Sequence, residues 1–232
     1  MDRPGPVWLN APPFAGASMD RSRYIVVEGP IGVGKSTLAR ILGQRYGART
    51  LFEVVEENPF LPLFYRDPER HAFQAQVFFL LSRFKQQQEL AQQELFAQHT
   101  VSDYLFAKDR IFAPLTLNPA ELALYDRVFD HLRPRVVKPD LVIYLQARLD
   151  VLLARIRRRG RDFERDFDAD YLARLCSAYN DYFFHYDETP LLVVNTSDID
   201  IVENEGDLEA LLGMIRKHQR GVTHYIPVSA CR

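Results

Sequence analysis

The segment GPIGVGKST at positions 29–37 constrains the fold of this chain more than any other feature. It fits the pattern Gly-x-x-x-x-Gly-Lys-Ser/Thr, follows an apolar run at 23–28 and precedes a helical pattern that starts at Leu38. A glycine-rich turn between a strand and a helix brings backbone N–H groups and the positive end of the helix to one point. This context disfavours an ordinary glycine-rich turn and predicts a phosphate-binding loop at the edge of a parallel sheet.

The residue types of this loop match the chemistry of a nucleoside triphosphate. Glycines let backbone N–H groups converge on phosphate oxygens without obstruction by a Cβ atom. Lys35 can bridge the β- and γ-phosphates, and the Ser36 hydroxyl can bind Mg²⁺. We expect ATP and Mg²⁺ as cofactors, with ATP held by Gly29, Pro30, Ile31, Gly32, Val33, Gly34, Lys35, Ser36 and Thr37.

The loop alone leaves the reaction open. GTPases read guanine with an Asn-Lys-x-Asp pattern, whereas positions 195–198 read Asn-Thr-Ser-Asp and lack the lysine. A small-molecule kinase and a nucleotide-sensing binding protein both remain possible at this point.

Short apolar runs alternate with helical patterns along the rest of the chain. Alternation of this kind predicts the α/β class, here a P-loop NTPase fold with helices on both faces of a five-stranded parallel sheet. We expect one domain over residues 21–232, with a helix at 207–220 that Asp207 caps and Gly221 ends. The other expected elements are strands at 23–28, 51–55, around Val101, 141–145 and 191–194, and helices at 71–98 and 121–132.

The composition excludes several classes of protein. The chain has 29 Lys+Arg against 31 Asp+Glu, a net charge of −2, which argues against nucleic-acid binding by a general basic field. Two cysteines are too few for a disulfide scaffold or a cysteine zinc cluster, and they indicate a reducing compartment. No apolar run approaches the roughly 18 residues of a membrane span. We therefore expect a cytoplasmic protein with a small-molecule substrate and no membrane or nucleic-acid partner.

Residues 1–20 differ from the rest because prolines and glycines dominate them and no hydrophobic period develops. We expect a disordered leader, and a chain that begins at Met19 should keep full activity.

Three further segments carry candidate site residues. Glu53 ends the second expected strand, and carboxyl ends of parallel strands face the ligand crevice, so this carboxylate can take a proton from a hydroxyl. Glu56 and Glu57 are rivals, and a solvated acidic strand end is the alternative. Gln76 and Arg83 are seven residues apart and share one helix face, which suits a polar ligand or, alternatively, exposure to solvent.

Five arginines occur in the seven residues 155–161, and acidic residues follow at once. Those carboxylates would repel the phosphates of a nucleic acid, which argues against a nucleic-acid surface. Guanidinium groups, in contrast, stabilise the charge on a phosphate during its transfer. We expect a short arginine-rich lid, with a solvated basic face as the alternative.

Together with the loop, the segments around Glu53 and at 64–83, 101–113 and 155–164 resemble the deoxynucleoside kinase family, closest to its bacterial deoxyadenosine/deoxyguanosine branch. The resemblance runs from about residue 24 to residue 215. It implies transfer of the ATP γ-phosphoryl group to the 5′-hydroxyl of a purine deoxynucleoside by a homodimer. We assign the Phe and Leu stripe of the helix at 71–98 to packing, including a dimer interface, and not to a ligand. The alternatives are a kinase of the same fold that acts on another nucleoside or on a nucleoside monophosphate, and a nonenzymatic ATP-binding protein.

The resemblance also implies roles for the matched residues. On the phosphate side, Lys35, Arg159 and Arg161 stabilise charge on the phosphoryl group, and Arg155, Arg159 and Arg161 contact ATP. On the acceptor side, the implied roles are general base for Glu53, base recognition for Gln76, Arg83 and Phe112, and binding of the sugar 3′-hydroxyl for Tyr65 and Glu164.

The chain departs from the family pattern in two places. Val54 replaces the proline of a Glu-Pro-Val element. Ser-Asp-Tyr stands at 102–104, where many members have an acidic residue followed by Arg and Ser. Asp103 can still bind Mg²⁺ or lie beside the substrate, but the phosphate contact of the missing arginine is left open. Lys108 stands where pyrimidine-using relatives often have Asp, which favours a purine substrate.

Overall fold

The computed structural model describes residues 23–93, 99–161, 164 and 168–227. The expected leader at 1–20 lies outside the described residues. Among the described residues, six strands form one parallel sheet in the order β2-β3-β1-β4-β5-β6. The strands are β1 Tyr24–Glu28, β2 Arg49–Leu51, β3 Thr100–Ser102, β4 Leu141–Gln146, β5 Leu191–Asn195 and β6 Val222–Tyr225.

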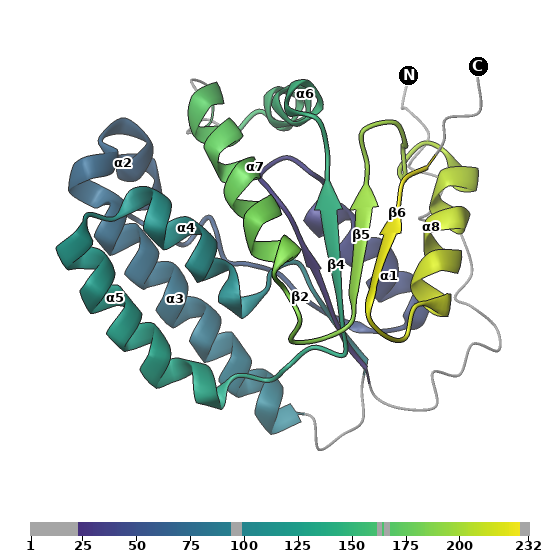
Figure 1. Ribbon diagram of the computed structural model, residues 1–232, viewed down its shortest axis with the longest axis horizontal. Coiled ribbons are helices and arrows are strands. Elements are labelled where there is room, and N and C mark those ends of the chain that lie inside the picture. Colours follow the sequence, from purple (N-terminus) through teal and green to yellow (C-terminus); the bar gives the residue numbers. More distant parts are fainter. Residues whose placement is uncertain (1–22, 94–98, 162–163, 165–167, 228–232) are drawn as a thin grey trace.

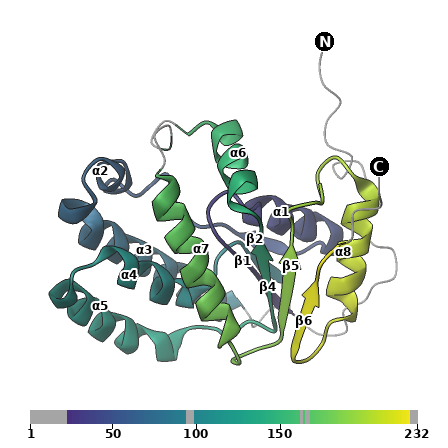
Figure 2. The same cartoon turned by 45° about the horizontal axis from the view of Figure 1, so that its top comes forward.

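Helices cover both faces of the sheet, as expected. Figures 1 and 2 show α1 and α8 on one side and α3, α4, α5 and α7 on the other. The helices are α1 Lys35–Tyr46, α2 Leu61–Arg66, α3 Pro68–Gln93, α4 Asp109–Thr116, α5 Pro119–Leu132, α6 Leu149–Arg159, α7 Ala169–Phe184 and α8 Glu205–Lys217. In the described part of the chain, none of these helices combines the length and the apolar character needed to cross a membrane.

The expected count of five strands is wrong, because β6 adds a sixth. This strand reads Val-Thr-His-Tyr and lies at the edge of the sheet, where its residues are only partly buried. A half-exposed edge strand needs no continuous apolar run, so the pattern that indicates buried strands misses it.

The ends of several elements also differ from expectation. β2 stops at Leu51 rather than continuing to 55, because the side chain of Asp103 accepts the Glu53 N–H and ends the backbone pairing. The N-cap of α8 is Asn204 rather than Asp207, and the helix ends at Lys217. Gly221 lies instead in the turn before β6, with φ at +67°.

The helices at 71–98 and 121–132 both start earlier than expected. Pro68 opens α3 and Pro119 opens α5, and proline is well suited to the first turn of a helix because its missing N–H has no helical acceptor there. Residues 94–98, where the first of these helices was expected to end, lie outside the described residues.

The sheet forms the centre of the main hydrophobic core. The side chains of β1 are buried throughout, as are those of β4 up to Leu145 and of β5 up to Val194. A second apolar cluster, which includes Phe64, Leu80 and Phe129, joins α2, α3, α4 and α5. The carboxyl ends of β1, β2 and β3 open between these two cores, and the candidate site lies there.

Candidate active site

The phosphate-binding loop depends on glycine at its two ends. Gly29 has φ at +151°, and a Cβ atom there would lie 2.4 Å from the carbonyl oxygen of Leu145. Gly34 has φ at +105° and is the last residue before α1. A side chain at either position would therefore distort the loop or the start of the helix.

Lys35 folds back over this loop. Its Nζ donates to the carbonyl oxygens of Gly29 at 2.7 Å and Pro30 at 3.1 Å. Burial, together with the nearby charge of Lys108, lowers the pKa of Lys35 to about 8. The ammonium thus lies where a triphosphate would contact the loop. The negative charge of a bound triphosphate would change the protonation of Lys35.

Glu53 lies two residues beyond β2 and is held by two cations. Arg83 Nη1 contacts Oε1 at 2.7 Å, and Lys108 Nζ contacts Oε2 at 2.9 Å. Burial alone would raise the pKa of Glu53, but the charges of Lys108 and Arg83 outweigh it and lower the pKa to about 2. The carboxylate is therefore ionised at neutral pH and has lone pairs left to accept a proton from a bound hydroxyl.

The structure separates Glu53 from its rivals. Glu56 is mostly exposed and pairs with Arg161 at 2.5 Å, and Glu57 is exposed as well. Neither is held by the cations that fix Glu53, so the geometry favours Glu53 as the acid–base group.

Arg83 is part of a longer buried network. Its second guanidinium nitrogen, Nη2, lies 2.5 Å from Oδ1 of Asp109, which also accepts a hydrogen bond from the Tyr125 hydroxyl at 2.5 Å. Burial raises the pKa of Asp109. Arg83 is 2% exposed, so the alternative of a solvent-facing position is wrong.

Asp103 joins the phosphate loop to Glu53. Its Oδ2 accepts a hydrogen bond from the Ser36 hydroxyl, and its Oδ1 accepts the Glu53 backbone N–H at 2.8 Å. Mg²⁺ commonly binds one or two protein oxygens together with substrate phosphates. A hydroxyl and a carboxylate side by side fit that requirement, although no group of three or more metal-binding side chains occurs among the described residues.

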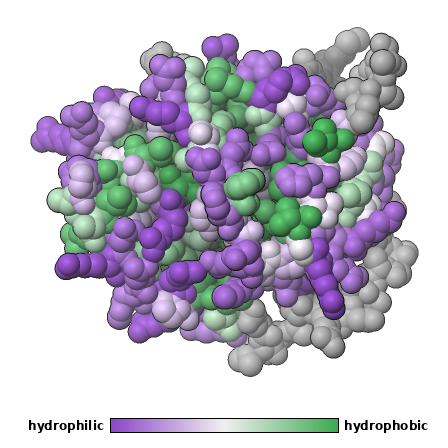
Figure 3. Space-filling model, in the orientation of Figure 1, coloured by the Kyte–Doolittle hydropathy of each residue, from purple (hydrophilic) through white to green (hydrophobic). Residues whose placement is uncertain are grey.

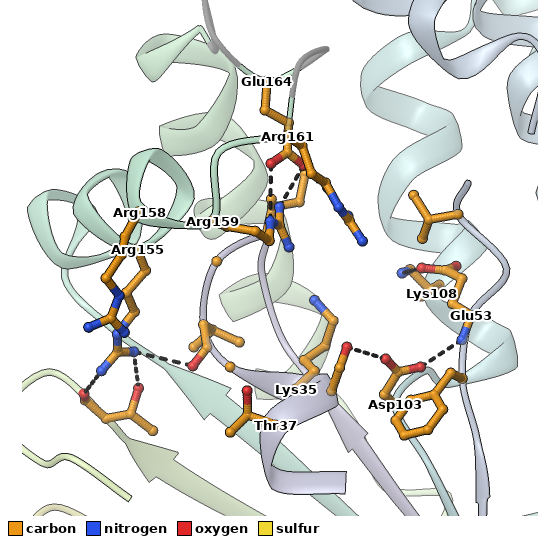
Figure 4. Close-up of a pocket in the computed structure, with 18 of the residues that line it drawn as sticks. Lys35, Thr37, Glu53, Asp103, Lys108, Arg155, Arg158, Arg159, Arg161 and Glu164 are labelled. Carbon is orange, nitrogen blue, oxygen red and sulfur yellow. Dashed lines mark hydrogen bonds and ion pairs between the residues drawn. The ribbon is translucent and has the colours of Figure 1, made fainter. Parts of the chain in front are cut away.

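The arginine-rich segment begins on α6 and closes over the loop. Arg155 donates to the Val33 carbonyl oxygen at 3.2 Å and to the Thr196 carbonyl oxygen at 2.9 Å. Arg159 forms a two-pronged pair with Glu164, with nitrogen–oxygen distances of 3.1 and 2.5 Å. Figure 4 shows Lys35 between these lid arginines and the group formed by Glu53, Lys108 and Asp103.

The acceptor side contains the remaining predicted residues. Gln76 is 5% exposed and its Nε2 donates to the Thr116 hydroxyl at 3.2 Å. Phe112 is half-buried, and its ring makes an edge contact with Tyr179 at 6.0 Å between centroids. Tyr65 lies on α2, and burial raises its pKa.

One cavity of about 990 Å³ brings these groups together. Every predicted site residue lines it except Gly29 and Pro30, which lie at the start of the loop. Its walls come from the phosphate loop, the segment after β2, helices α2, α3, α4 and α6, and the segment after β5. A nucleotide and a second small molecule can therefore share this space.

Sequence reasoning missed several parts of the site. Lys108 was noted only as a substitution, yet it pairs directly with Glu53. Asp109 and Tyr125 fix Arg83, and the segment Thr196–Val202 contributes part of the cavity wall. The charged residues 108–110 stand between apolar residues at 105–107 and 111–113, which was a usable signal, because charges in such a setting rarely lack partners.

Comparisons with known proteins agree along most of the chain. A family model described as deoxynucleoside kinase matches residues 25–219. A deoxyguanosine kinase of Bacillus subtilis is 37% identical over 204 residues, covering 86% of this chain and 99% of that protein. A deoxyadenosine kinase of Lactobacillus acidophilus is 32% identical over 214 residues, covering 86% and 98%. A solved structure of deoxyadenosine kinase from M. mycoides with bound dCTP shares the fold, with a TM-score of 0.72 at 24% identity and coverage of 83% and 98%.

Proposed function

The chain belongs to the deoxynucleoside kinase family, and from that premise we propose that it transfers the γ-phosphoryl group of ATP to the 5′-hydroxyl of a purine deoxynucleoside. The observation that carries this proposal is the juxtaposition, in one cavity, of Lys35 on a phosphate loop and an ionised Glu53. The first binds the donor and the second can take the proton of the acceptor.

On the donor side, the backbone N–H groups from Gly29 to Thr37 and the start of α1 bind the triphosphate. Lys35, Arg159 and Arg161 lie around the position of the γ-phosphate and stabilise charge during its transfer. Ser36 and Asp103 would hold Mg²⁺, which neutralises charge on the β- and γ-phosphate oxygens when it is bound. Arg155 keeps the loop and the lid helix together through Val33 and Thr196.

On the acceptor side, Glu53 accepts the proton of the 5′-hydroxyl as that oxygen bonds to the γ-phosphorus and ADP leaves. Tyr65 and Glu164 bind the sugar 3′-hydroxyl. The Gln76 amide can both donate to and accept from a base edge, and the Phe112 ring can stack on the base. Arg83 pairs with Glu53 and Asp109. It therefore supports the nucleobase indirectly, by fixing the cavity wall beside it.

The purine preference rests on two observations. Position 108 carries a lysine that is committed to Glu53, so the acceptor pocket has no carboxylate there for a pyrimidine base. The relatives described above are named as deoxyguanosine and deoxyadenosine kinases. We further infer a cytoplasmic enzyme, in line with its low cysteine content.

We also infer a homodimer. Leu81 of α3 and Leu124 of α5 are 49% and 53% exposed, and these two helices pack side by side. Figure 3 shows apolar groups over α4 and α5, and further apolar groups near α6 and on the side of β5 and β6. A second copy of the chain is the partner that would cover the region of Leu81 and Leu124.

A kinase assay tests the proposal directly. ATP consumption should require one of the four deoxynucleosides and should be fastest with deoxyguanosine or deoxyadenosine. Phosphorylation of dAMP or dGMP but not of the nucleosides would indicate a monophosphate kinase. ATP binding without consumption of ATP by any acceptor would indicate a nonenzymatic binding protein.

Glu53→Gln tests the assigned base. General-base catalysis contributes about 10²- to 10⁴-fold, so kcat should fall by a factor in that range while the affinity for the deoxynucleoside changes little. Glu57→Gln is the matched control, because Glu57 is exposed and does not line the cavity. Equal effects of the two substitutions would remove Glu53 from the base role.

A further inference from the structure

Lys108 is a buried cation that the reaction outlined above does not use. It ends the short 3-10 turn Phe106–Lys108 before α4, lines the cavity and is only 5% exposed. Its Nζ lies 2.9 Å from Glu53 Oε2 and 5.1 Å from the centroid of the Phe112 ring. An ammonium in such a place needs an anionic partner that compensates for its loss of water, and in the free protein Glu53 is that partner.

The two cations on Glu53 are held differently. Arg83 bridges two carboxylates, those of Glu53 and Asp109, and is therefore fixed from both sides. Lys108 pairs with Glu53 alone among the carboxylates of the described residues. Its ammonium carries three donors on a flexible stem, so it can accept another anion without breaking a second pair.

Lys108 also lies close to the phosphate loop. Lys108 and the loop residues from Ile31 to Thr37 line the same cavity, and Figure 4 shows Lys35 between the lid arginines and the group that contains Lys108. Arg110, the next basic residue along the chain, points away and pairs with Asp126 and Asp130 at the surface. Of these two basic residues after β3, Lys108 is thus the one directed at both Glu53 and the site of the phosphate donor.

A proton transfer to Glu53 changes the charge balance at this point. Once Glu53 has taken the proton of the 5′-hydroxyl it is neutral, and the ammonium of Lys108 loses the carboxylate that compensated its burial. A buried charge without a partner is strongly unfavourable. The newly formed 5′-phosphate, which lies between Glu53 and Lys35, supplies the anion that replaces the carboxylate.

We propose that Lys108 positions Glu53 in the free enzyme and then pairs with the transferred phosphoryl group as Glu53 takes the proton. The O–H bond of the acceptor breaks, its oxygen bonds to the γ-phosphorus, ADP leaves, and the proton stays on Glu53. The inference rests on the proposed function, because it requires Glu53 to act as the base. It assigns to Lys108 a direct contact with the product phosphate.

Lys108→Met keeps the apolar stem over Phe112 and removes the charge. A lost hydrogen bond between charged groups corresponds to about 10- to 100-fold, so kcat should fall by that factor while the KM values for ATP and deoxynucleoside change less than about threefold. The Kd of the deoxynucleoside 5′-monophosphate, measured by calorimetry, should weaken by about the same factor, whereas the Kd of the uncharged deoxynucleoside should not. Lys108→Arg should restore most of both losses.

Arg110→Met is the matched control, since it removes a cation of α4 that does not line the cavity. Thermal unfolding verifies that each variant is folded, and Lys108→Gln replaces Lys108→Met if the latter fails that check. Unchanged affinity for the monophosphate in the folded variant would overturn the inference.

A double-mutant cycle with Glu53→Gln separates the two proposals. If Lys108 acts with Glu53, adding Lys108→Met to Glu53→Gln should lower kcat by less than the single Lys108→Met change does. If the factors by which the two single substitutions lower kcat simply multiply in the double variant, the inference is overturned and Glu53 remains the general base. An unaffected kcat in Glu53→Gln alone would instead remove Glu53 from the base role, and the absence of deoxynucleoside phosphorylation by the unaltered protein would overturn the proposed function.

Discussion

At the scale of single residues, Lys35 has different partners before and after a nucleotide binds. In the free protein its ammonium donates to the carbonyl oxygens of Gly29 and Pro30, and burial and Lys108 lower its pKa to about 8. A bound triphosphate places several negative charges beside it, and opposite charges at close range favour the protonated form of a lysine. Binding should therefore raise this pKa.

The consequence is a pH dependence of ATP binding with a defined sign. Well below pH 8 Lys35 is already protonated and binding takes up no proton, whereas well above pH 8 the free protein has lost the proton that the complex retains. ATP affinity should therefore decline as the pH rises through 8, with proton uptake that approaches one per ATP at about pH 9. Calorimetry in buffers of different ionisation enthalpy measures this uptake.

The control for this experiment is Lys35→Met, which should abolish the proton uptake. It should also weaken ATP binding by about 10- to 100-fold, the range expected for a lost hydrogen bond to a charged group. Proton uptake that persists in the variant would mean that another group titrates.

At the scale of elements, the direction of the lid depends on how α6 ends. Gly160 is the C-cap of this helix, with φ at +68°, and its N–H donates to the Ile156 carbonyl oxygen at 3.2 Å. Arg159 precedes this turn and Arg161 follows it, so the left-handed conformation of one residue separates the two lid arginines. Lid geometry is thus set by a backbone requirement rather than by the arginines themselves.

Replacing this glycine should destabilise the protein through backbone strain. A Cβ atom at Gly160 would meet only one atom within 4 Å, at 3.9 Å, so Gly160→Ala should lower the free energy of unfolding by about 1 kcal/mol from the left-handed conformation alone. Urea unfolding measures the change.

Gly213→Ala is the matched control at the same scale. Gly213 lies inside α8, its φ is not positive, and nothing lies within 4 Å of an added Cβ atom. Alanine in a helix interior is better than glycine by about 0.5–1 kcal/mol, so this variant should gain stability. Changes of the same sign in the two variants would contradict the argument.

At the scale of the whole molecule, two hydrophobic cores meet around one cavity. The sheet core holds the phosphate loop, and the second apolar cluster holds the helices that carry Gln76, Arg83 and Phe112. The exposed leucines of α3 and α5 lie on the outer side of that second cluster, where a partner copy would stabilise the acceptor half of the site.

Association can be tested by substitution on that surface. Light scattering after size exclusion should give twice the mass of one chain, and the double variant Leu81→Glu, Leu124→Glu should give the mass of a single chain, because buried carboxylates without partners oppose an apolar interface. Phe184→Glu is the control, since Phe184 is 85% exposed on α7, a helix that packs mainly against α4 and α6 rather than against α3 or α5. A dimer that survives the double substitution would place the interface elsewhere.

The local features of this protein could be derived from its sequence. The loop at 29–37, the α/β alternation and the arginine-rich segment are contiguous patterns, and each reflects a backbone geometry or a charge density that nearby residues create by themselves. For the same reason Glu53, Gln76 and Arg83 could be identified as unusual polar groups. The resemblance to the deoxynucleoside kinase family also rests on short segments of this kind, and the comparisons confirm it.

Only the tertiary structure decided how those groups are paired. Glu53 and Arg83 are 30 residues apart, Glu53 and Lys108 are 55 apart, and Arg155 reaches Val33 across 122 residues. Such pairs depend on how helices pack against the sheet, which no local spacing specifies. The sixth strand was missed for a related reason, because an edge strand is stabilised by its neighbour's backbone rather than by an apolar pattern of its own. Residue chemistry thus determined which groups could act, and packing determined which of them meet.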